Sequence, residues 1–242
     1  MLRGLMMDRP LLVSSVIDFA ADVYPGVEVV SQTVEGGVHR YGYGEARQRI
    51  GRLANALRSL GVKPGDRVAT LAWNGYRHFE LYYAISGIGA VCHTINPRLF
   101  PAQITYIANH AADTALFFDL TFAPLVDKLA PTLTYVRSYV VMTDREHMPK
   151  TPSHALCYED LLADIPAAIT WPEFDENTAS ALCYTSGTTG DPRACFIPTA
   201  PPCCIPCSSS PRFRTPLPAA ARFCPWFPCS TPMPGACPTS PR

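Results

Sequence analysis

A run of hydroxyls and glycines between residues 184 and 193 is the part of this sequence whose residue types best suit chemistry. It reads Tyr-Thr-Ser-Gly-Thr-Thr-Gly-Asp-Pro-Arg. Gly187 and Gly190 allow backbone conformations that other residues rarely adopt, so the surrounding hydroxyls and backbone N–H groups can converge on phosphate oxygens. The spacing is not that of a Walker A loop, which requires G-x-x-x-x-G-K-[ST]. We predict a phosphate-binding loop here, with a flexible Ser/Thr/Gly connector as the alternative.

The loop resembles the signature of the adenylate-forming superfamily, Y-T-S-G-T-T-G-x-P-K-G, which acyl-CoA synthetases, luciferases and adenylation domains of peptide synthetases share. The resemblance implies that the loop holds the β- and γ-phosphates of ATP while a carboxylate attacks the α-phosphorus, after which the CoA thiol attacks the acyl-adenylate. Such chemistry depends more on electrostatic clamping of phosphate than on acid–base groups. The resemblance implies that Thr185, Ser186, Gly187, Thr188, Thr189 and Gly190 bind the phosphates of ATP, whereas Tyr184 begins the loop and positions it.

Further segments upstream resemble the same family, at residues 43–45, 61–69, 74, 89–91 and 96–99. The similarity covers residues 11–192, which implies the opening portion of the family's large N-terminal domain. It implies fatty acid, ATP and CoA as small-molecule partners, with Mg²⁺. The family's later lysine, its acidic ribose ligand and its Mg²⁺-binding glutamate lie beyond the matching segment, so we assign no catalytic residue and no metal ligand.

Apolar periodicity upstream predicts the elements that position the loop. Helical patterns cover residues 15–23, 45–60, 76–88, 101–110, 122–129 and 158–163. Strand patterns cover residues 27–33, 38–43, 68–72, 90–95, 115–118, 139–142 and 179–184, the first two forming a hairpin. Strand–helix alternation predicts an α/β fold, a parallel sheet with flanking helices. We therefore expect an incomplete N-terminal domain of an adenylate-forming enzyme, with the last strand leading directly into the loop.

The histidines and aromatic residues of these elements invite structural interpretations. His78, His93 and His110 have no metal-ligand spacing, so we interpret them as structural or surface residues. Trp73 and the pair Tyr82-Tyr83 are expected in the core. Residues 96–98 could line a site, but we prefer a turn at the end of a strand.

The composition changes abruptly at Pro192. Residues 1–192 hold all 20 acidic residues and 15 of the 20 Lys and Arg, whereas residues 193–242 hold five Arg, no acid, 13 of the 25 Pro and 7 of the 10 Cys. The net charge of zero therefore combines two unlike segments and says nothing about partners. A Pro-rich segment without periodic aliphatics cannot bury enough surface to offset chain entropy. We divide the chain into an N-terminal extension (1–10), a partial AMP-dependent synthetase/ligase domain (11–192) and a disordered Pro/Cys-rich tail (193–242).

A single lost base accounts for this tail. The family expects Lys-Gly after the proline, where this chain has Arg193-Ala194. Residues 192–195 can be encoded CCC AGG GCG TGC, and one restored A permits P-K-G-V. In that frame residues 223–236 permit L-P-V-V-P-M-F-H-A-N-A-W-G, which resembles fatty-acid–CoA ligases rather than aryl-CoA ligases or luciferases; one Val is forced by Trp226-Phe227. We predict a frameshift after Pro192 and an inactive product.

Three alternatives remain open for the tail and the chain. Cys203, Cys204 and Cys207 could hold a metal ion, but their spacing is not a zinc pattern and no histidine follows Ala194. A Pro-rich docking segment would make the chain a non-catalytic interaction protein. The third alternative is a fragment of an adenylating enzyme that does not use CoA.

Cysteine usage and hydropathy favour a cytoplasmic protein. Residues 1–192 contain only three scattered cysteines, which suits a reducing compartment. No stretch of 18 or more apolar residues occurs, so we expect no membrane span. Arg3, Asp8 and Arg9 interrupt any signal-peptide core. We also expect no nucleic-acid partner.

Overall fold

The computed structural model describes residues 9–150, 152, 154–185 and 192–199, all within one compact unit, Met1–Cys204. Its centre is a seven-stranded sheet with the order β7-β6-β5-β3-β4-β8-β9. Neighbouring strands are parallel throughout, except for the antiparallel pair β8 and β9. The strands are β3 (Arg67–Leu71), β4 (Val91–Thr94), β5 (Ala115–Phe118), β6 (Ser138–Val141), β7 (Leu156–Cys157), β8 (Ala179–Thr185) and β9 (Arg193–Pro198).

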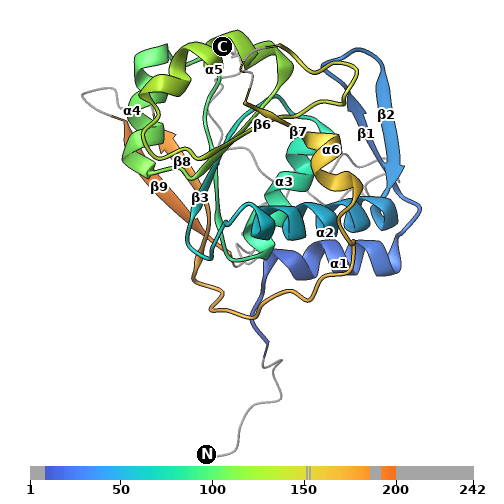
Figure 1. Cartoon of the computed structure of the whole chain (residues 1–242). Helices are drawn as coiled ribbons and strands as arrows, with labels where there is room; N and C mark the ends of the chain where they lie inside the picture. The colour runs from blue at the N-terminus through green and yellow to red at the C-terminus, as the bar shows by residue number, and fades with distance from the viewer. Residues whose placement is uncertain (1–8, 151, 153, 186–191, 200–242) are drawn as a thin grey trace, which may run out of the picture. The chain divides into compact units, whose positions relative to one another are not determined.

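Helices cover both faces of this sheet (Figure 1). The helices are α1 (Val13–Val23), α2 (Tyr43–Ser59), α3 (Tyr76–Gly87), α4 (Pro101–Ala111), α5 (Ala123–Leu129) and α6 (Tyr158–Ala163). One core cluster joins α1, α2, α3 and α6 to one face, and another joins α4 and α5 to the opposite face. Short 3₁₀ turns at Leu120–Phe122 and Ala130–Thr132 flank α5. The architecture is the predicted three-layer α/β arrangement.

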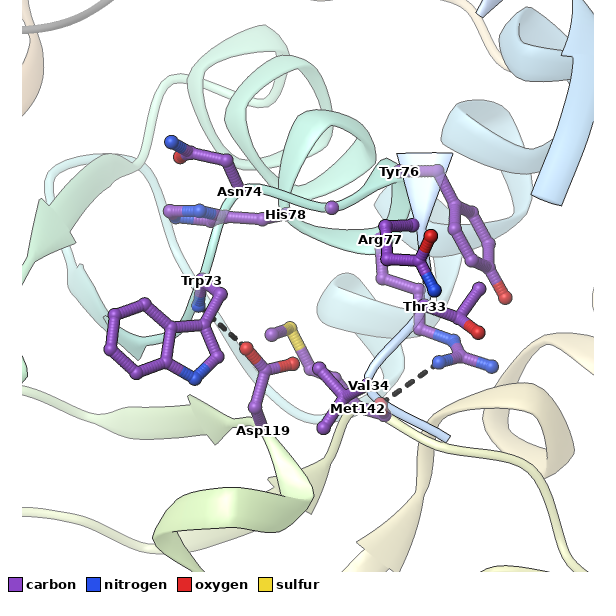
Figure 2. Close-up of a pocket in the computed structure, with 11 residues that line it drawn as sticks. Thr33, Val34, Trp73, Asn74, Tyr76, Arg77, His78, Asp119 and Met142 are labelled. Atoms are coloured by element: carbon purple, nitrogen blue, oxygen red, sulfur yellow. Dashed lines mark hydrogen bonds between the residues drawn. The ribbon is translucent and has the colours of Figure 1, made fainter. Parts of the chain in front are cut away.

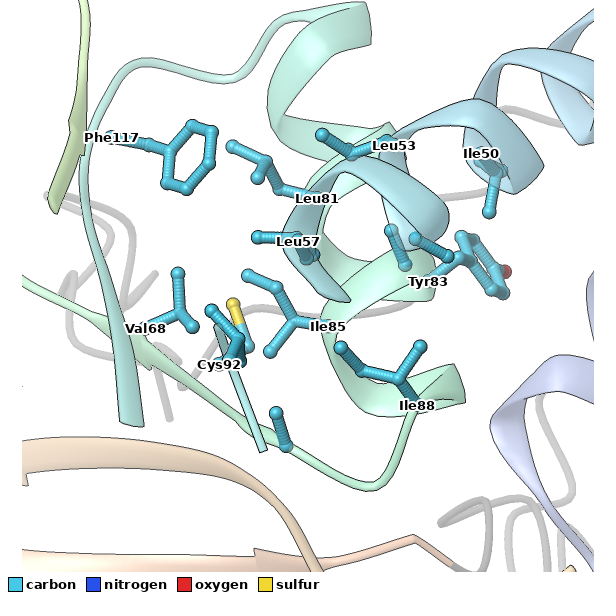
Figure 3. Packing of buried hydrophobic residues seen from close by; sticks show 14 of the residues in the cluster. Ile50, Leu53, Leu57, Val68, Leu81, Tyr83, Ile85, Ile88, Cys92 and Phe117 are labelled. Carbon is cyan, nitrogen blue, oxygen red and sulfur yellow. The ribbon is translucent and has the colours of Figure 1, made fainter. Parts of the chain in front are cut away.

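The larger core cluster lies between α2, α3 and the sheet (Figure 3). On α2, Ile50, Leu53 and Leu57 recur at helical spacing and each is fully buried. They pack with α3 and with sheet residues such as Val68 and Phe117. Burying a large apolar side chain contributes roughly 1.5–3 kcal/mol, so this stripe of α2 fixes the helix on the sheet.

Strand β5 shows why the sheet has helices on both faces. Its sequence, Ala-Leu-Phe-Phe, is apolar at every position, and all four residues are buried. Phe117 belongs to the core cluster beneath α2 and α3, whereas Leu116 and Phe118 belong to the cluster beneath α4 and α5. Such continuous apolar runs are typical of parallel strands that are covered on both sides.

A separate two-stranded hairpin consists of β1 (Glu28–Gln32) and β2 (Val38–Gly42), as predicted. Its antiparallel register pairs Gln32 with Val38 at the turn. Gly36 and Gly37 in this turn have φ of 100° and 102°, a region that side chains other than glycine rarely adopt. The two glycines therefore let the chain reverse here.

A strap of irregular chain from residue 164 to residue 178 crosses the helices before it enters β8. A Cβ added to Gly51 would lie 2.1 Å from the carbonyl oxygen of Ala167, and one added to Gly87 would lie 2.6 Å from the ring of Trp171. The guanidinium of Arg47 lies 5.0 Å from the centre of the same ring. Two glycines thus let the strap approach α2 and α3 closely, and the strap leads the chain into the strand that precedes the predicted loop.

The tail prediction is wrong for residues 193–198. These residues, expected to be disordered, form β9, which pairs antiparallel with β8 and matches Leu182 with Phe196 and Cys183 with Cys195. The sequence Cys-Phe-Ile suits a strand, and Pro198 stands at its end on an edge of the sheet, where a missing N–H donor is tolerated. Residues 200–242 lie outside the described part of the chain. The short strand β7 was also not predicted.

None of the helices within the described residues combines the length and the apolar character that crossing a membrane requires.

Candidate functional site

Strand β8 carries the predicted phosphate-binding loop to the carboxyl end of the parallel sheet. β8 lies between β4 and β9, and pairs parallel with β4 through Thr94 and Cys183. Tyr184 and Thr185 are the final residues of the strand. Ligands of open α/β sheets bind outside the carboxyl ends of the strands, so this is where a phosphate-binding loop is expected. The predicted residues Ser186, Gly187, Thr188, Thr189 and Gly190 lie outside the described residues.

Tyr184 is held at this strand end by groups from two neighbouring elements. Its hydroxyl shares a hydrogen bond of 2.6 Å with Nδ1 of His110 on α4. Its ring centre lies 5.2 Å from that of His93 on β4, at an interplanar angle of 46°. The ring of His110 in turn stacks on Tyr106 at 5.6 Å. The residue that begins the loop is therefore held against α4 and β4.

Beneath Tyr184 lies a buried histidine–carboxylate pair. Nδ1 of His93 lies 2.9 Å and 2.8 Å from the two carboxylate oxygens of Asp113, which follows α4. Both side chains are wholly inaccessible to solvent. Burial raises the pKa of Asp113, and the hydrogen bond from His93 opposes that change. Among the described residues, Nε2 of His93 is buried and has no hydrogen-bond partner.

Sequence analysis interpreted His93 and His110 as structural or surface residues and did not mention Asp113. The structure brings all three together around Tyr184. A signal was present in the sequence, because His93 is a titratable residue inside the apolar strand Val91–Thr94. A buried polar side chain requires a partner, so a histidine at that position predicts a nearby acceptor.

A pocket opens at the carboxyl ends of β3, β5 and β6 (Figure 2). Its lining residues come from the hairpin turn, the β3–α3 connection and the ends of β5 and β6: Gln32, Thr33, Val34, Trp73, Asn74, Gly75, Tyr76, Arg77, His78, Asp119 and Met142. The backbone N–H of Trp73 donates a hydrogen bond of 2.6 Å to Asp119. Arg77 donates one of 3.0 Å to the carbonyl oxygen of Met142. Asp119 and Arg77 are therefore both hydrogen-bonded to backbone groups of the pocket, whose lining mixes polar with aromatic and apolar side chains.

Two buried groups of this pocket have shifted acidities. Burial raises the pKa of Asp119 to about 6 and lowers the pKa of His78 to about 4. Nε2 of His78 lies 3.0 Å from the hydroxyl of Thr70.

Trp73, which was expected in the core, is 43% exposed at the pocket, so that expectation is wrong. The indole follows the end of β3, where no helix covers it fully, whereas Tyr83 on α3 is buried as predicted.

A charged network lies beside the pocket and ties the hairpin turn to the helices. Arg77 forms ion pairs with Glu35 at 2.6 Å and with Glu159 at 2.8 Å. Arg49 pairs with Glu159 at 3.0 Å and with the fully buried Glu80 at 2.7 Å. Burial opposes ionisation of Glu159, but Arg49 and Arg77 together lower its pKa. The network pairs these charged side chains, although Oε2 of Glu35 has no hydrogen-bond partner among the described residues. It joins four segments, which is a structural role.

The described residues offer no ready metal centre. Among them, no group of three or more His, Cys, Asp or Glu residues could hold a metal ion. Asp119 and Glu35 are both engaged, the first by Trp73 and the second by Arg77 and Thr143. The part of the chain that the structure covers therefore contains no preformed set of metal ligands.

The comparisons with known proteins agree with the fold. The model of the AMP-binding enzyme family matches residues 17–220, a range that continues past Pro192. The 3-methylmercaptopropionyl-CoA ligase of Ruegeria lacuscaerulensis is 50% identical over 192 residues, which are 78% of this chain and 35% of that protein. The medium-chain-fatty-acid–CoA ligase of Ectopseudomonas oleovorans is 45% identical over 191 residues, with the same coverage of 78% and 35%. This chain thus spans about a third of the length of these curated relatives.

Solved structures show the same fold. An anthranilate–CoA ligase in complex with anthranoyl-AMP superposes with a TM-score of 0.71 at 22% identity, over 80% of this chain and 36% of that one. A fatty acyl CoA synthetase of Mycobacterium tuberculosis gives a TM-score of 0.65 at 21% identity, over 78% and 34%. Because the family model matches more than half of its residues, this chain belongs to the AMP-binding enzyme family.

Proposed function

We propose that this chain supplies the ATP-phosphate-binding part of an AMP-forming fatty-acid–CoA ligase. The observation that carries the proposal is the Tyr-Thr-Ser-Gly-Thr-Thr-Gly run directly at the carboxyl end of β8. Tyr184 is anchored there by His93 and His110, so the loop begins from a rigid position. Similarity to acyl-CoA ligases over the same residues supports the assignment.

The proposed reaction needs the loop to bind charge. A fatty-acid carboxylate attacks the α-phosphorus of ATP, pyrophosphate leaves, and an acyl-adenylate remains. The CoA thiol then attacks the acyl carbonyl and AMP leaves. Residues 185–190 would donate hydrogen bonds to the β- and γ-phosphates, which stabilises the charge that pyrophosphate carries away. Mg²⁺ would neutralise part of the same charge, and the chain's own described residues supply the anchor of the loop.

Two classes of acid follow from the relatives. The names of two relatives specify medium-chain and long-chain fatty acids. Two others, at 50% and 48% identity, are named for 3-methylmercaptopropionate, a short thioether acid. A fatty acid is the substrate we propose, and the thioether acid is the second candidate. A cytoplasmic location belongs to the same proposal and is supported by the three scattered cysteines of residues 1–192.

We also propose that the sequence after Pro192 results from a lost base and that the chain as printed does not form acyl-CoA. The support is the loss of Lys-Gly at residues 193–194, the absence of acids beyond them and the family-like string that the shifted frame permits. Arg193 keeps a positive charge beside the loop where the family has Lys, so the expected inactivity rests on the family segments that the shifted frame replaces and not on a lost charge.

A pyrophosphate-release assay tests the function. The chain and the open reading frame with one base restored would each receive ATP, Mg²⁺, CoA and one of five acids: octanoate, palmitate, 3-methylmercaptopropionate, benzoate and cinnamate. We expect background from the chain, and release from the restored protein that depends on both the acid and CoA, with octanoate or palmitate preferred. Release that depends on the acid but not on CoA would identify an adenylating enzyme of another kind. No acid-dependent release from a folded restored protein would contradict the proposal.

A further inference from the structure

The pair formed by His93 and Asp113 has features that a mere core contact does not need. Both side chains are inaccessible to solvent, although burying an ionisable pair costs free energy that apolar side chains of similar volume would not. The carboxylate can only accept, so Nδ1 of His93 carries the hydrogen that it donates to Asp113. That bond fixes the tautomer and the plane of the imidazole. Asp113 thus holds the ring of His93 in one orientation.

The orientation of the His93 ring matters because Tyr184 packs against it. Tyr184, the penultimate residue of β8, places its aromatic ring 5.2 Å from His93. The hydroxyl of Tyr184 also shares a hydrogen bond of 2.6 Å with Nδ1 of His110 on α4. His93 and Tyr184 lie on neighbouring parallel strands, since β4 pairs with β8 through His93 and Leu182. The imidazole of His93 therefore contacts the ring of Tyr184, the residue before the last one of β8.

We propose that the His93–Asp113 pair is a positioning element for nucleotide binding, which holds Tyr184 and so fixes where the phosphate-binding loop begins. The inference rests on the proposed function, because it gives this pair a role in binding ATP. His93 acts through Tyr184 and touches no reacting atom. Nε2 of His93 is buried and has no hydrogen-bond partner among the described residues. This agrees with a role in which the ring supports Tyr184 through its face and makes one hydrogen bond, to Asp113.

Asparagine at position 93 separates positioning from simple core stability. The side-chain amide of His93→Asn can still donate a hydrogen bond to Asp113, so the carboxylate does not become a buried unpaired charge. It removes the aromatic face beneath Tyr184. A second variant, Tyr184→Leu, removes the other ring of the contact and leaves His93 and Asp113 in place. Tyr184→Leu also removes the hydrogen bond with His110, so its effect on the loop should be at least as large as that of His93→Asn.

The chain offers a matched control in a second histidine–aspartate pair. Nδ1 of His147 lies 2.7 Å from Oδ1 of Asp144, the same contact as in the buried pair, but the two side chains are 47% and 40% exposed. The pair lies in the turn after β6, and three strands, β5, β3 and β4, lie between β6 and β8 in the sheet. His147→Asn makes the same chemical change away from Tyr184.

The test is an amide NMR comparison of the full 242-residue chain labelled at threonine and glycine. We expect His93→Asn and Tyr184→Leu to move the resonances of Gly187 and Gly190, and to weaken binding of Mg·ATP by about fivefold or more, as couplings between sites typically do. His147→Asn should change neither. Unmoved loop resonances in folded His93→Asn would overturn the positioning role, and so would loop changes that His147→Asn reproduces.

The two proposals fail separately in this experiment. If Mg·ATP shifts no resonance of the parent chain, the proposed function is contradicted, while the comparison of unliganded loop resonances still decides the positioning role. If Mg·ATP binds equally well to parent and to His93→Asn, the function stands and the positioning role is overturned. Should His93→Asn fail to fold, His93→Gln takes its place, because its side-chain amide can also donate to Asp113 while the aromatic face beside Tyr184 is removed.

Discussion

The backbone N–H of Trp73 donates a hydrogen bond of 2.6 Å to Oδ2 of Asp119, and this bond joins the carboxyl ends of β3 and β5. Both residues line the pocket of Figure 2. Asp119 thus accepts a hydrogen bond from Trp73, but its burial disfavours the ionised form of the carboxyl group. The stability of the fold should therefore depend on the ionisation of Asp119.

Asp119 should make the fold less stable as pH rises. Burial raises its pKa to about 6, above the ordinary 3.8, so its contribution is fully present below about pH 4 and is lost as pH rises through about 6. Asp119→Asn keeps an acceptor for Trp73. At about pH 8 we expect this variant to be more stable than the parent by about 1–3 kcal/mol, since one pKa unit corresponds to about 1.4 kcal/mol. Urea unfolding at both ends of this range measures it.

His78 provides the control with the opposite sign. Burial lowers its pKa to about 4 from 6.5, so its contribution is present above about pH 6.5 and is lost as pH falls toward about 4. His78→Gln retains a side-chain amide near the hydroxyl of Thr70 and cannot take up a proton. The variant should lose less stability in acid than the parent does. If both variants followed the parent's pH dependence, neither group would be titrating as described.

Arg49 should contribute more to the stability of the fold than an exposed arginine does, because its partner Glu80 is buried. Its Nε donates at 2.7 Å to Glu80, whose side chain is 0% exposed and also accepts a hydrogen bond of 2.6 Å from Tyr158. Arg49→Met leaves that carboxylate buried without its cation, which costs about 3–5 kcal/mol. Thermal and urea unfolding of the purified variant would show the loss.

The exposed pair Arg40–Glu28 is the comparison for that variant. Its atoms lie 3.1 Å apart, close to the separation in the buried pair, but the side chains are 59% and 56% exposed. Solvent screens such pairs, so Arg40→Met should cost less than about 1 kcal/mol. Equal losses from the two methionine variants would show that the buried network does not carry the stability assigned to it.

Gly87→Ala should loosen the strap that leads into β8. A Cβ there would lie 2.6 Å from the ring of Trp171, so the indole must move, at a cost of about 1–3 kcal/mol for an overpacked site. Trp171 should then become more exposed, and its fluorescence should shift to the red. Gly26→Ala is the matched control, since nothing lies within 4 Å of the added atom. A red shift in both variants, or in neither, would argue against the packing described.

Much of the fold follows from local patterns in the sequence, but the positioning cluster does not. The all-apolar run of β5 and the stripe of Ile50, Leu53 and Leu57 on α2 each predict their own burial. The pairing of His93 with Asp113 joins residues 20 positions apart in the sequence. It forms only because the chain returns to the sheet after α4, which places Asp113 beside His93 of β4. Periodicity reports which face of an element is buried, and does not report which polar group meets it there.

Strand β9 illustrates a second limit. Composition over residues 193–242 is dominated by proline and lacks acids, and that average hid the short strand-forming run of Cys195, Phe196 and Ile197. The free energy of a strand depends on its neighbours, and β8 provides a partner along its whole edge. An average over a segment therefore cannot exclude a strand that an adjacent edge stabilises.

The frameshift proposal predicts a specific result from resequencing the DNA across codons 192–194. An additional base should appear, the new frame should read P-K-G after the threonine- and glycine-rich run, and it should stay open beyond codon 242. Codons 179–191 should read as printed and serve as the internal control. Reads that reproduce the printed frame, or an early stop codon in the shifted one, would end the frameshift explanation. The family model matches residues up to 220, so the end of the match does not mark the proposed frameshift at Pro192. The DNA sequence is therefore needed to locate it.

The most direct test of the account is to ask which phosphates the loop binds. Mg·ATP, magnesium pyrophosphate and AMP would each be titrated into the chain labelled at threonine and glycine, with the amide resonances of Thr185, Gly187, Thr188, Thr189 and Gly190 as the readout. The account predicts that ATP and pyrophosphate shift these resonances in a saturable way, whereas AMP, which lacks β- and γ-phosphates, leaves them nearly unchanged. Loop resonances that respond to none of the three ligands, or that respond to AMP as strongly as to ATP, would contradict it.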